Sequence, residues 1–204
     1  MLRVALTGGI ATGKTYCLSG LAALGAPVID ADRLARDAVA PGTAGLAAVT
    51  ARFGPEVLTA TGALDRARVA AIVFADARAR QDLERIVHPI VYRGISDWAA
   101  GLAAAGRPLG VADVPLLYET GHDRDFDRVV VAACAPDAQV RRLVERNGLS
   151  EADARRRIDA QWPIERKRAA ADYVIDTGGT FDETDRRVED VWQALQRDAA
   201  ARTP

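Results

Sequence analysis

The feature that most constrains this chain is an eight-residue stretch near its start, Gly8-Gly9-Ile10-Ala11-Thr12-Gly13-Lys14-Thr15. It matches the pattern G-x-x-x-x-G-K-[ST] at every fixed position. Glycines allow such a loop to curl its N–H groups around phosphate oxygens, at the positive end of the following helix. The pattern therefore predicts a nucleoside triphosphate site. The alternative, a glycine turn with an incidental lysine, is disfavoured because a strand pattern precedes the loop and a helix pattern follows it.

Within this stretch, each residue type suggests a role. Residues 9–16 would surround the phosphates, Lys14 would reach the β- and γ-phosphates, and the Thr15 hydroxyl would hold Mg²⁺. Lys14 and Lys167 are the only lysines in a chain with 27 basic residues, so each invites a specific explanation.

The remaining pattern predicts a parallel α/β sheet. Short apolar runs at residues 2–7, 27–30, 109–114, 128–134 and 173–176 read as strands, and helical patterns lie between them. Gly25 and Gly148 are expected helix stops, Asp65 and Ser150 are expected N-caps, and Pro89 is expected to break or restart a helix after His88. Strands alternating with helices imply a five-stranded parallel sheet with helices on both faces.

The whole chain, 1–204, is expected to form one domain with two helical inserts. The inserts cover about residues 33–105 and 141–170. Since inserts after strand ends overlie the ligand crevice of an open α/β sheet, we interpret them as a substrate cap and a lid.

Two carboxylates, Asp30 and Asp32, end the second predicted strand. Residues at i and i+2 of an extended chain point the same way, so both could face the crevice, one as a base and one acting through Mg²⁺-bound water or a cation. The alternative is that one or both cap the next helix.

The loop and these acids are part of a longer resemblance. The chain is similar to the dephospho-CoA kinase family over about residues 1–180. The shared segments, in order, are residues 6–15, 28–32, 88–89, 114–119, 142–148, 157–161 and 171–176. The resemblance implies a nucleotide-kinase type fold containing a phosphate-binding loop, with ATP and Mg²⁺ as cofactors. It also implies transfer of a phosphoryl group to the ribose 3′-hydroxyl of dephospho-CoA, the final step of coenzyme A synthesis.

The same resemblance implies individual roles. Asp32 would take the proton from the ribose hydroxyl, and Arg142 and Arg146 would approach the transferring phosphoryl group; a solvated helix face is the alternative for either arginine. Other candidates come from the residues themselves. His88, at the predicted helix break near the cap, would contact the substrate or else cap the preceding helix, and Pro115 and Leu116, after the third strand, read as crevice wall. Asp113 stands where P-loop proteins often hold Mg²⁺ through water, and Asp113 and Glu119 are candidates to assist the metal.

Three residues depart from the family's usual pattern. Ala11 and Tyr16 replace smaller or more flexible residues of the loop, and Thr177 stands where the family often has Asn, which puts an adenine contact there in question.

Composition excludes several other classes. A net charge of −1 argues against a protein that coats nucleic acid, and no apolar run approaches the length of a membrane span. Cys17 and Cys134 read as reduced core thiols, so we expect a cytoplasmic protein, with a monomer favoured. The alternatives are a nucleoside or nucleotide kinase of the same fold and a GTP-dependent switch, although the Asn-Lys-x-Asp guanine motif is absent.

Overall fold

The computed structural model describes residues 1–202, in two compact units. The first unit comprises Met1–Ile29 and the chain from Ala99 onward, and the second is Asp30–Trp98.

The first unit is built on a parallel sheet with the strand order β2-β3-β1-β4-β5. The strands are β1 (Leu2–Gly8), β2 (Val28–Asp30), β3 (Leu109–Asp113), β4 (Arg128–Ala133) and β5 (Tyr173–Asp176). In register, Val4 pairs with Val111 of β3 on one side and with Arg128 of β4 on the other. Because β1 is central and its neighbours lie far along the chain, its carboxyl end is a switch point of the sheet, where ligands of open α/β sheets bind.

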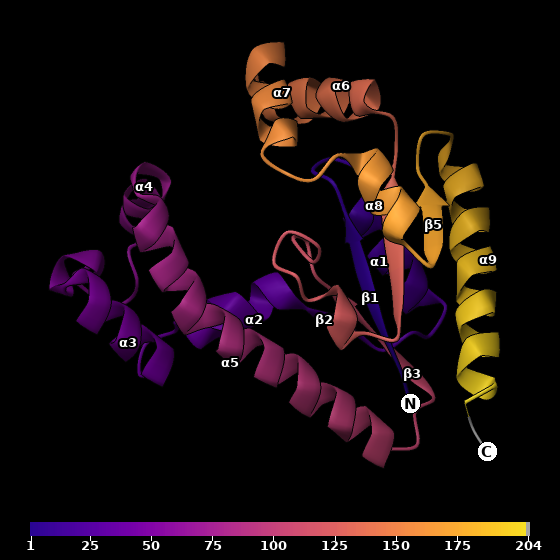
Figure 1. The fold of residues 1–204 in the computed structure, drawn as a ribbon, viewed down its shortest axis with the longest axis horizontal. Coiled ribbons are helices and arrows are strands. Elements are labelled where there is room, and N and C mark those ends of the chain that lie inside the picture. Colours follow the sequence, from indigo (N-terminus) through magenta and orange to yellow (C-terminus); the bar gives the residue numbers. More distant parts are fainter. Residues whose placement is uncertain (203–204) are drawn as a thin grey trace. The chain divides into compact units, whose positions relative to one another are not determined.

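Two helices bury one face of this sheet. These are α1 (Lys14–Ala23) and α9 (Phe181–Ala200), and Figure 1 shows α9 running alongside β5. The shared core has these members: Leu2, Val4, Leu6, Cys17, Leu21, Ala26, Leu109, Val111, Val130, Ala132, Ile175, Val188, Val191, Leu195 and Ala199. Alternate residues of β4, Val129 and Val131, are buried on the opposite face, and α8 (Ile164–Ala170) contacts this strand.

The predicted caps are confirmed. Ser150 accepts a hydrogen bond from the Asp153 N–H and begins α7 (Glu151–Asp159), and Gly148 ends α6 (Pro136–Asn147) in the left-handed conformation. Both cysteines are buried and free, as expected, and burial raises the pKa of the Cys17 thiol to about 12. The capping box of Thr180 and Glu183, which begins α9, was not predicted.

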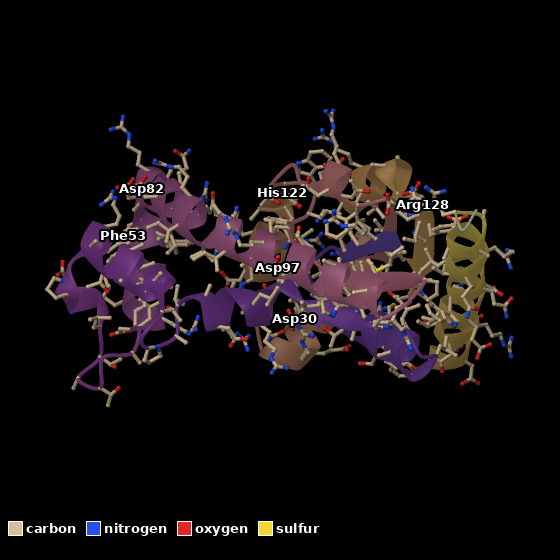
Figure 2. The ribbon with its side chains drawn as sticks, turned by 90° about the horizontal axis from the view of Figure 1, so that it is seen from below. Asp30, Phe53, Asp82, Asp97, His122 and Arg128 are labelled. Atoms are coloured by element: carbon tan, nitrogen blue, oxygen red, sulfur yellow. The ribbon has the colours of Figure 1, made fainter. Side chains whose placement is uncertain are left out.

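The second unit is helical, with α2 (Ala31–Ala38), α3 (Ala44–Phe53), a short 3₁₀ turn at Pro55–Val57, α4 (Arg66–Ala75) and most of α5 (Ala77–Ala104). Asp65 caps α4, as predicted. The core of this unit is formed by Val39, Val49, Phe53, Val57, Val69 and Ala79. Phe53 of α3 and Asp82 of α5 both belong to this unit (Figure 2). Arg52 Nε, from the residue before Phe53, donates to Asp82 Oδ2 at 2.5 Å.

The prediction that Pro89 interrupts the helix after His88 is wrong. α5 continues through Pro89, and the break comes earlier, at Asp76, whose carboxylate accepts the Arg78 N–H. A proline inside a helix removes one backbone hydrogen bond. Here the helix buries Ala79 before the proline and Val91 and Ile95 after it, so apolar packing on both sides offsets that loss.

Candidate active site

The predicted phosphate loop, residues 8–15, joins the end of β1 to the start of α1. Its shape depends on residues with special backbone requirements. Gly13 has φ 83° and Ala11 has φ 59°, both in the left-handed region. At Gly8, an added Cβ would lie 2.6 Å from Ala132 O and 2.6 Å from Thr12 Oγ1, so only glycine fits between the sheet and the loop.

Each of the first five carbonyl oxygens of the loop accepts a side-chain hydrogen bond. The donors and distances are Lys167 Nζ to Gly8 O at 3.0 Å, Thr12 Oγ1 to Gly9 O at 2.9 Å, Gln139 Nε2 to Ile10 O at 2.6 Å, Arg142 Nη1 to Ala11 O at 3.2 Å and Thr177 Oγ1 to Thr12 O at 2.6 Å. Four of these donors come from residues 139–177, far from the loop in sequence.

These hydrogen bonds orient the loop's amides. In a trans peptide unit the C=O of one residue and the N–H of the next point in opposite directions. Holding the carbonyls of Gly8, Ile10 and Thr12 on donors therefore turns the N–H groups of Gly9, Ala11 and Gly13 away from those donors. No side chain caps α1, so its first-turn N–H groups remain available to an anion as well.

Two loop amides are not available in this way. The Ile10 N–H donates to Gln161 Oε1 at 2.8 Å, and the Thr12 N–H makes a longer bond of 3.3 Å to Gly9 O. The loop is thus a preformed cradle whose geometry is fixed by neighbouring side chains as well as by its own glycines.

Lys14, the cation of the loop, is paired with Asp113 at the carboxyl end of β3. The Asp113 side chain is 8% exposed and that of Lys14 15%. The structure therefore brings the predicted phosphate-binding lysine together with the acid that we considered for Mg²⁺. Thr15 follows Lys14 on an exposed turn of α1.

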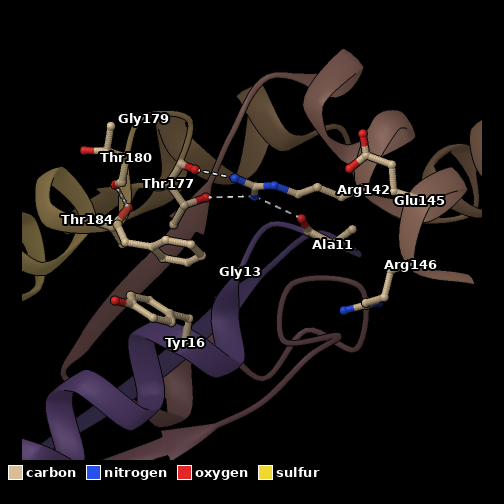
Figure 3. A pocket seen from close by; sticks show the side chains of 11 residues that line it. Ala11, Gly13, Tyr16, Arg142, Glu145, Arg146, Thr177, Gly179, Thr180 and Thr184 are labelled. Atoms are coloured by element: carbon tan, nitrogen blue, oxygen red, sulfur yellow. Dashed lines mark hydrogen bonds between the residues drawn. The ribbon is translucent and has the colours of Figure 1, made fainter.

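A cavity of about 690 Å³ lies beside the loop (Figure 3). Its lining includes Ala11, Gly13, Tyr16, Arg142, Glu145, Arg146, Thr177, Gly179, Thr180, Phe181 and Thr184. The loop contributes one wall, α6 another, and the turn between β5 and α9 a third.

Two aromatic rings meet at this cavity. The centroids of Tyr16 and Phe181 are 5.0 Å apart, and Phe181 is 72% exposed. The Tyr16 hydroxyl donates to Asp185 Oδ1 at 2.7 Å, which raises the pKa of Tyr16. A large apolar ring exposed at a cavity beside a phosphate cradle is suited to stack on a planar base.

Arg142 joins the loop to the cavity wall. Its guanidinium donates to Ala11 O, to Thr177 O at 2.5 Å and to Thr177 Oγ1 at 3.3 Å, as Figure 3 shows. Arg146, one turn further along α6, is exposed and donates to its neighbour Asn147. Thr177, the departure from the family pattern, thus acts as a brace for both the loop and Arg142.

Sequence reasoning missed several residues of the cradle. Gln139 gave no signal, because it lies in no recognisable motif, and Gln161 ends the shared segment 157–161 but was given no role of its own. Lys167 gave a weak signal through the scarcity of lysine; it is fully buried and pairs with Glu119 Oε1 at 2.7 Å. Pro115 O accepts from Thr7 Oγ1 at 3.1 Å, and Leu116 is 44% exposed.

The candidates for acceptor chemistry, Asp32 and His88, belong to the second unit. Asp30 is the N-cap of α2, because its Oδ1 accepts the N–H groups of Asp32 and Arg33 at 2.7 and 3.2 Å. Asp32 lies in the first turn of α2 and is exposed. Of the two acids that could have capped the helix, Asp30 is therefore the cap, and the Asp32 side chain is not. The His88 ring packs edge-on against Tyr92, one turn along α5.

The donor set suits Mg²⁺. A hydroxyl at Thr15 and a carboxylate at Asp113 are hard oxygen ligands, and Mg²⁺ in phosphotransferases is held by one or two such groups plus substrate phosphates. Within residues 1–202 no cluster of three His, Cys, Asp or Glu side chains is placed to hold a metal ion.

A parallel sheet with a phosphate loop after its central strand defines the class: this is a P-loop kinase. The model of the family "Dephospho-CoA kinase" matches residues 2–183, and the chain belongs to that family.

The individual relatives agree with the family match. The dephospho-CoA kinase of Anaeromyxobacter dehalogenans is 50% identical over 176 residues, covering 86% of this chain and 83% of that protein. That of Geobacillus kaustophilus is 43% identical over 199 residues, covering 96% and 99%.

Solved structures support the same fold. A Thermus thermophilus crystal structure matches with a TM-score of 0.80 at 32% identity, covering 95% of this chain and 97% of the other. Dephospho-CoA kinase from Campylobacter jejuni matches at 0.74 and 24% identity, covering 96% and 98%; this second likeness shows the fold alone. None of the helices in residues 1–202 has the length and apolar character needed to cross a bilayer.

Proposed function

We propose that this protein transfers the γ-phosphoryl group of ATP to the ribose 3′-hydroxyl of dephospho-CoA, giving CoA and ADP. One observation supports ATP as the phosphate donor. Five loop carbonyl oxygens accept hydrogen bonds from side chains, and this orients N–H groups of the loop toward an anion. The acceptor half rests on family membership.

For the donor, the triphosphate would lie on residues 9–16 and the base in the cavity beside Tyr16 and Phe181. Lys14 would exchange Asp113 for the β- and γ-phosphates. Thr15 and Asp113 would hold Mg²⁺, which neutralises charge on the phosphates when bound.

Arg142 and Arg146 are our candidates for the cations that approach the transferred group. Phosphoryl transfer depends mainly on positioning and charge stabilisation, which arginines supply well. Arg142 would have to exchange one of its carbonyl acceptors to do so, whereas Arg146 is bonded only to the adjacent Asn147 side chain among the described residues.

For the acceptor, Asp32 would accept the proton of the attacking hydroxyl. Within the described chain its carboxylate has no hydrogen-bond or ion-pair partner, since Asp30 alone caps α2, so it is chemically free to act as a base. His88, Pro115 and Leu116 would contact dephospho-CoA. In this proposal residues 33–105 serve as a substrate cap and 141–170 as a lid within one enzyme, which works as a cytoplasmic monomer.

The test is a coupled ADP-release assay with purified protein, ATP and Mg²⁺. Dephospho-CoA is compared with nucleosides and nucleoside monophosphates as acceptors, and the product is checked for a 3′-phosphate. We expect turnover with dephospho-CoA to exceed that with the other acceptors by at least a hundred-fold. Turnover confined to nucleosides or nucleotides would replace the proposal with a kinase of another acceptor class, and acceptor-independent GTP hydrolysis would indicate a switch.

A further inference from the structure

Lys167 of α8 is the largest fully buried side chain of the described chain, and it carries a charge. Burying an ammonium group is costly unless it is paired and hydrogen-bonded. Its Nζ has two acceptors: Glu119 Oε1 at 2.7 Å and the carbonyl oxygen of Gly8, the first residue of the phosphate loop, at 3.0 Å.

The Glu119 carboxylate is itself held in place. Its Oε1 also accepts the Trp162 N–H at 2.9 Å, while its Oε2 is buried without a partner among the described residues. The neighbouring Tyr118 ring stacks on the Trp162 ring, with centroids 5.6 Å apart and planes 9° from parallel. The pair is therefore rigidly mounted, and the Lys167 ammonium is directed at one backbone atom.

That backbone atom matters because its peptide unit includes an amide of the phosphate loop. The unit that carries Gly8 O also carries the Gly9 N–H, which points the opposite way. A Cβ added at Gly8 would lie 2.6 Å from Ala132 O and from Thr12 Oγ1, so these close neighbours leave the Gly8 backbone little freedom to move. A fixed hydrogen bond on Gly8 O thus sets the direction of the Gly9 N–H.

We infer that Lys167 is a positioning residue for phosphate binding: it holds Gly8 O so that the Gly9 N–H faces the nucleotide's phosphates, and Glu119 serves to neutralise it. The inference rests on the proposed binding of ATP by this loop. The competing interpretation is an ion pair that only attaches α8 to the sheet. The two interpretations predict different ATP affinities for a variant that lacks the charges of both Lys167 and Glu119.

The experiment compares Lys167→Met with the double variant Lys167→Met/Glu119→Gln. The single variant leaves the Glu119 charge buried and unpaired, so we expect a large fall in the unfolding midpoint. The double variant buries no unpaired charge, so its unfolding midpoint should return most of the way to the wild-type value. Both variants lack the lysine ammonium that donates to Gly8 O, and methionine has no donor to replace it. We therefore expect the double variant to bind both ATP and inorganic tripolyphosphate at least ten-fold more weakly than the wild type, by calorimetry.

Dephospho-CoA affinity serves as an internal control and should stay within about three-fold of the wild-type value. A second control is Leu195→Ala in α9, a fully buried core residue outside the loop's contacts, which should lower the midpoint without changing ATP affinity. If ATP affinity recovers together with stability in the double variant, or if Leu195→Ala weakens ATP binding as much, the inference is wrong. If the wild type itself binds neither ATP nor tripolyphosphate, the proposed function fails instead.

Discussion

The ammonium group of Lys14, in the phosphate loop, forms an ion pair with the carboxylate of Asp113 at the end of β3. Both side chains are largely buried, so neither charge is strongly screened by water. The pair places a cation suited to phosphates next to an acid suited to a metal, and binding of Mg²⁺ and ATP would redistribute these contacts.

This relationship leads to a prediction about Asp113→Asn. Without Mg²⁺, the variant should bind ATP about ten-fold more tightly than the wild type, roughly 1.4 kcal/mol, because Lys14 is released and a repelling carboxylate is removed. With Mg²⁺, this advantage should disappear or reverse, because the variant lacks the carboxylate that we propose as a Mg²⁺ ligand. Calorimetric titrations with ATP in EDTA and in Mg²⁺ measure both affinities. If Mg²⁺ increases the ATP affinity of the wild type and of the variant by the same factor, Asp113 does not have the proposed role.

A second prediction concerns Asp32. Asp32→Asn should retain the affinity for ATP and lose about 10²- to 10⁴-fold in kcat, because the proton acceptor is gone while the loop is untouched. The matched variant is Asp30→Ala, which removes the N-cap of α2 and should cost about 1 kcal/mol of unfolding free energy with a much smaller loss of kcat. Near-normal turnover by Asp32→Asn would show that Asp32 is not the base.

Ala11 offers a test of loop strain. It is the one non-glycine residue with positive φ among the described residues, and an L-residue in this region is less stable than glycine by about 1 kcal/mol. Ala11→Gly should therefore raise the free energy of unfolding by about 0.5 kcal/mol, after allowing for the greater flexibility of glycine in the unfolded chain. Urea unfolding measures the change. Ala11→Val should move it in the opposite direction, and a stabilising Val would refute the argument.

The cavity beside the loop gives a fourth prediction. If the base of ATP stacks on Phe181, Phe181→Ala should weaken ATP binding by about five- to thirty-fold, the equivalent of about 1–2 kcal/mol of stacking. Because the ring is 72% exposed, stability should change little. Inorganic tripolyphosphate, which has no base, is the control ligand; its affinity should be unchanged. Equal losses for ATP and tripolyphosphate would place the base elsewhere.

Local sequence was sufficient for the five strands, for several helix ends and for the loop between β1 and α1. Strand runs, N-caps such as Ser150 and helix stops such as Gly148 depend on residues a few positions apart, so they can be recognised without a fold. Pro89 shows the limit of such rules, because its effect on α5 was outweighed by packing between residues distant in sequence. The spacing of Asp30 and Asp32 suggested a base without deciding between the two acids, and the family resemblance assigned that role to Asp32 and supplied the roles of Arg142 and Arg146.

The amino-acid sequence by itself determined that a glycine-rich loop with the phosphate-binding pattern follows the first strand, because that pattern depends only on glycines and a lysine at fixed spacing. Only the tertiary structure decided how the cradle is held. Its carbonyl oxygens are bound by Gln139, Arg142, Lys167 and Thr177, which the folding of the sheet and of α6–α8 brings to the loop. A hydrogen bond requires two groups within about 3 Å, and for residues more than a hundred positions apart that proximity is a property of the fold.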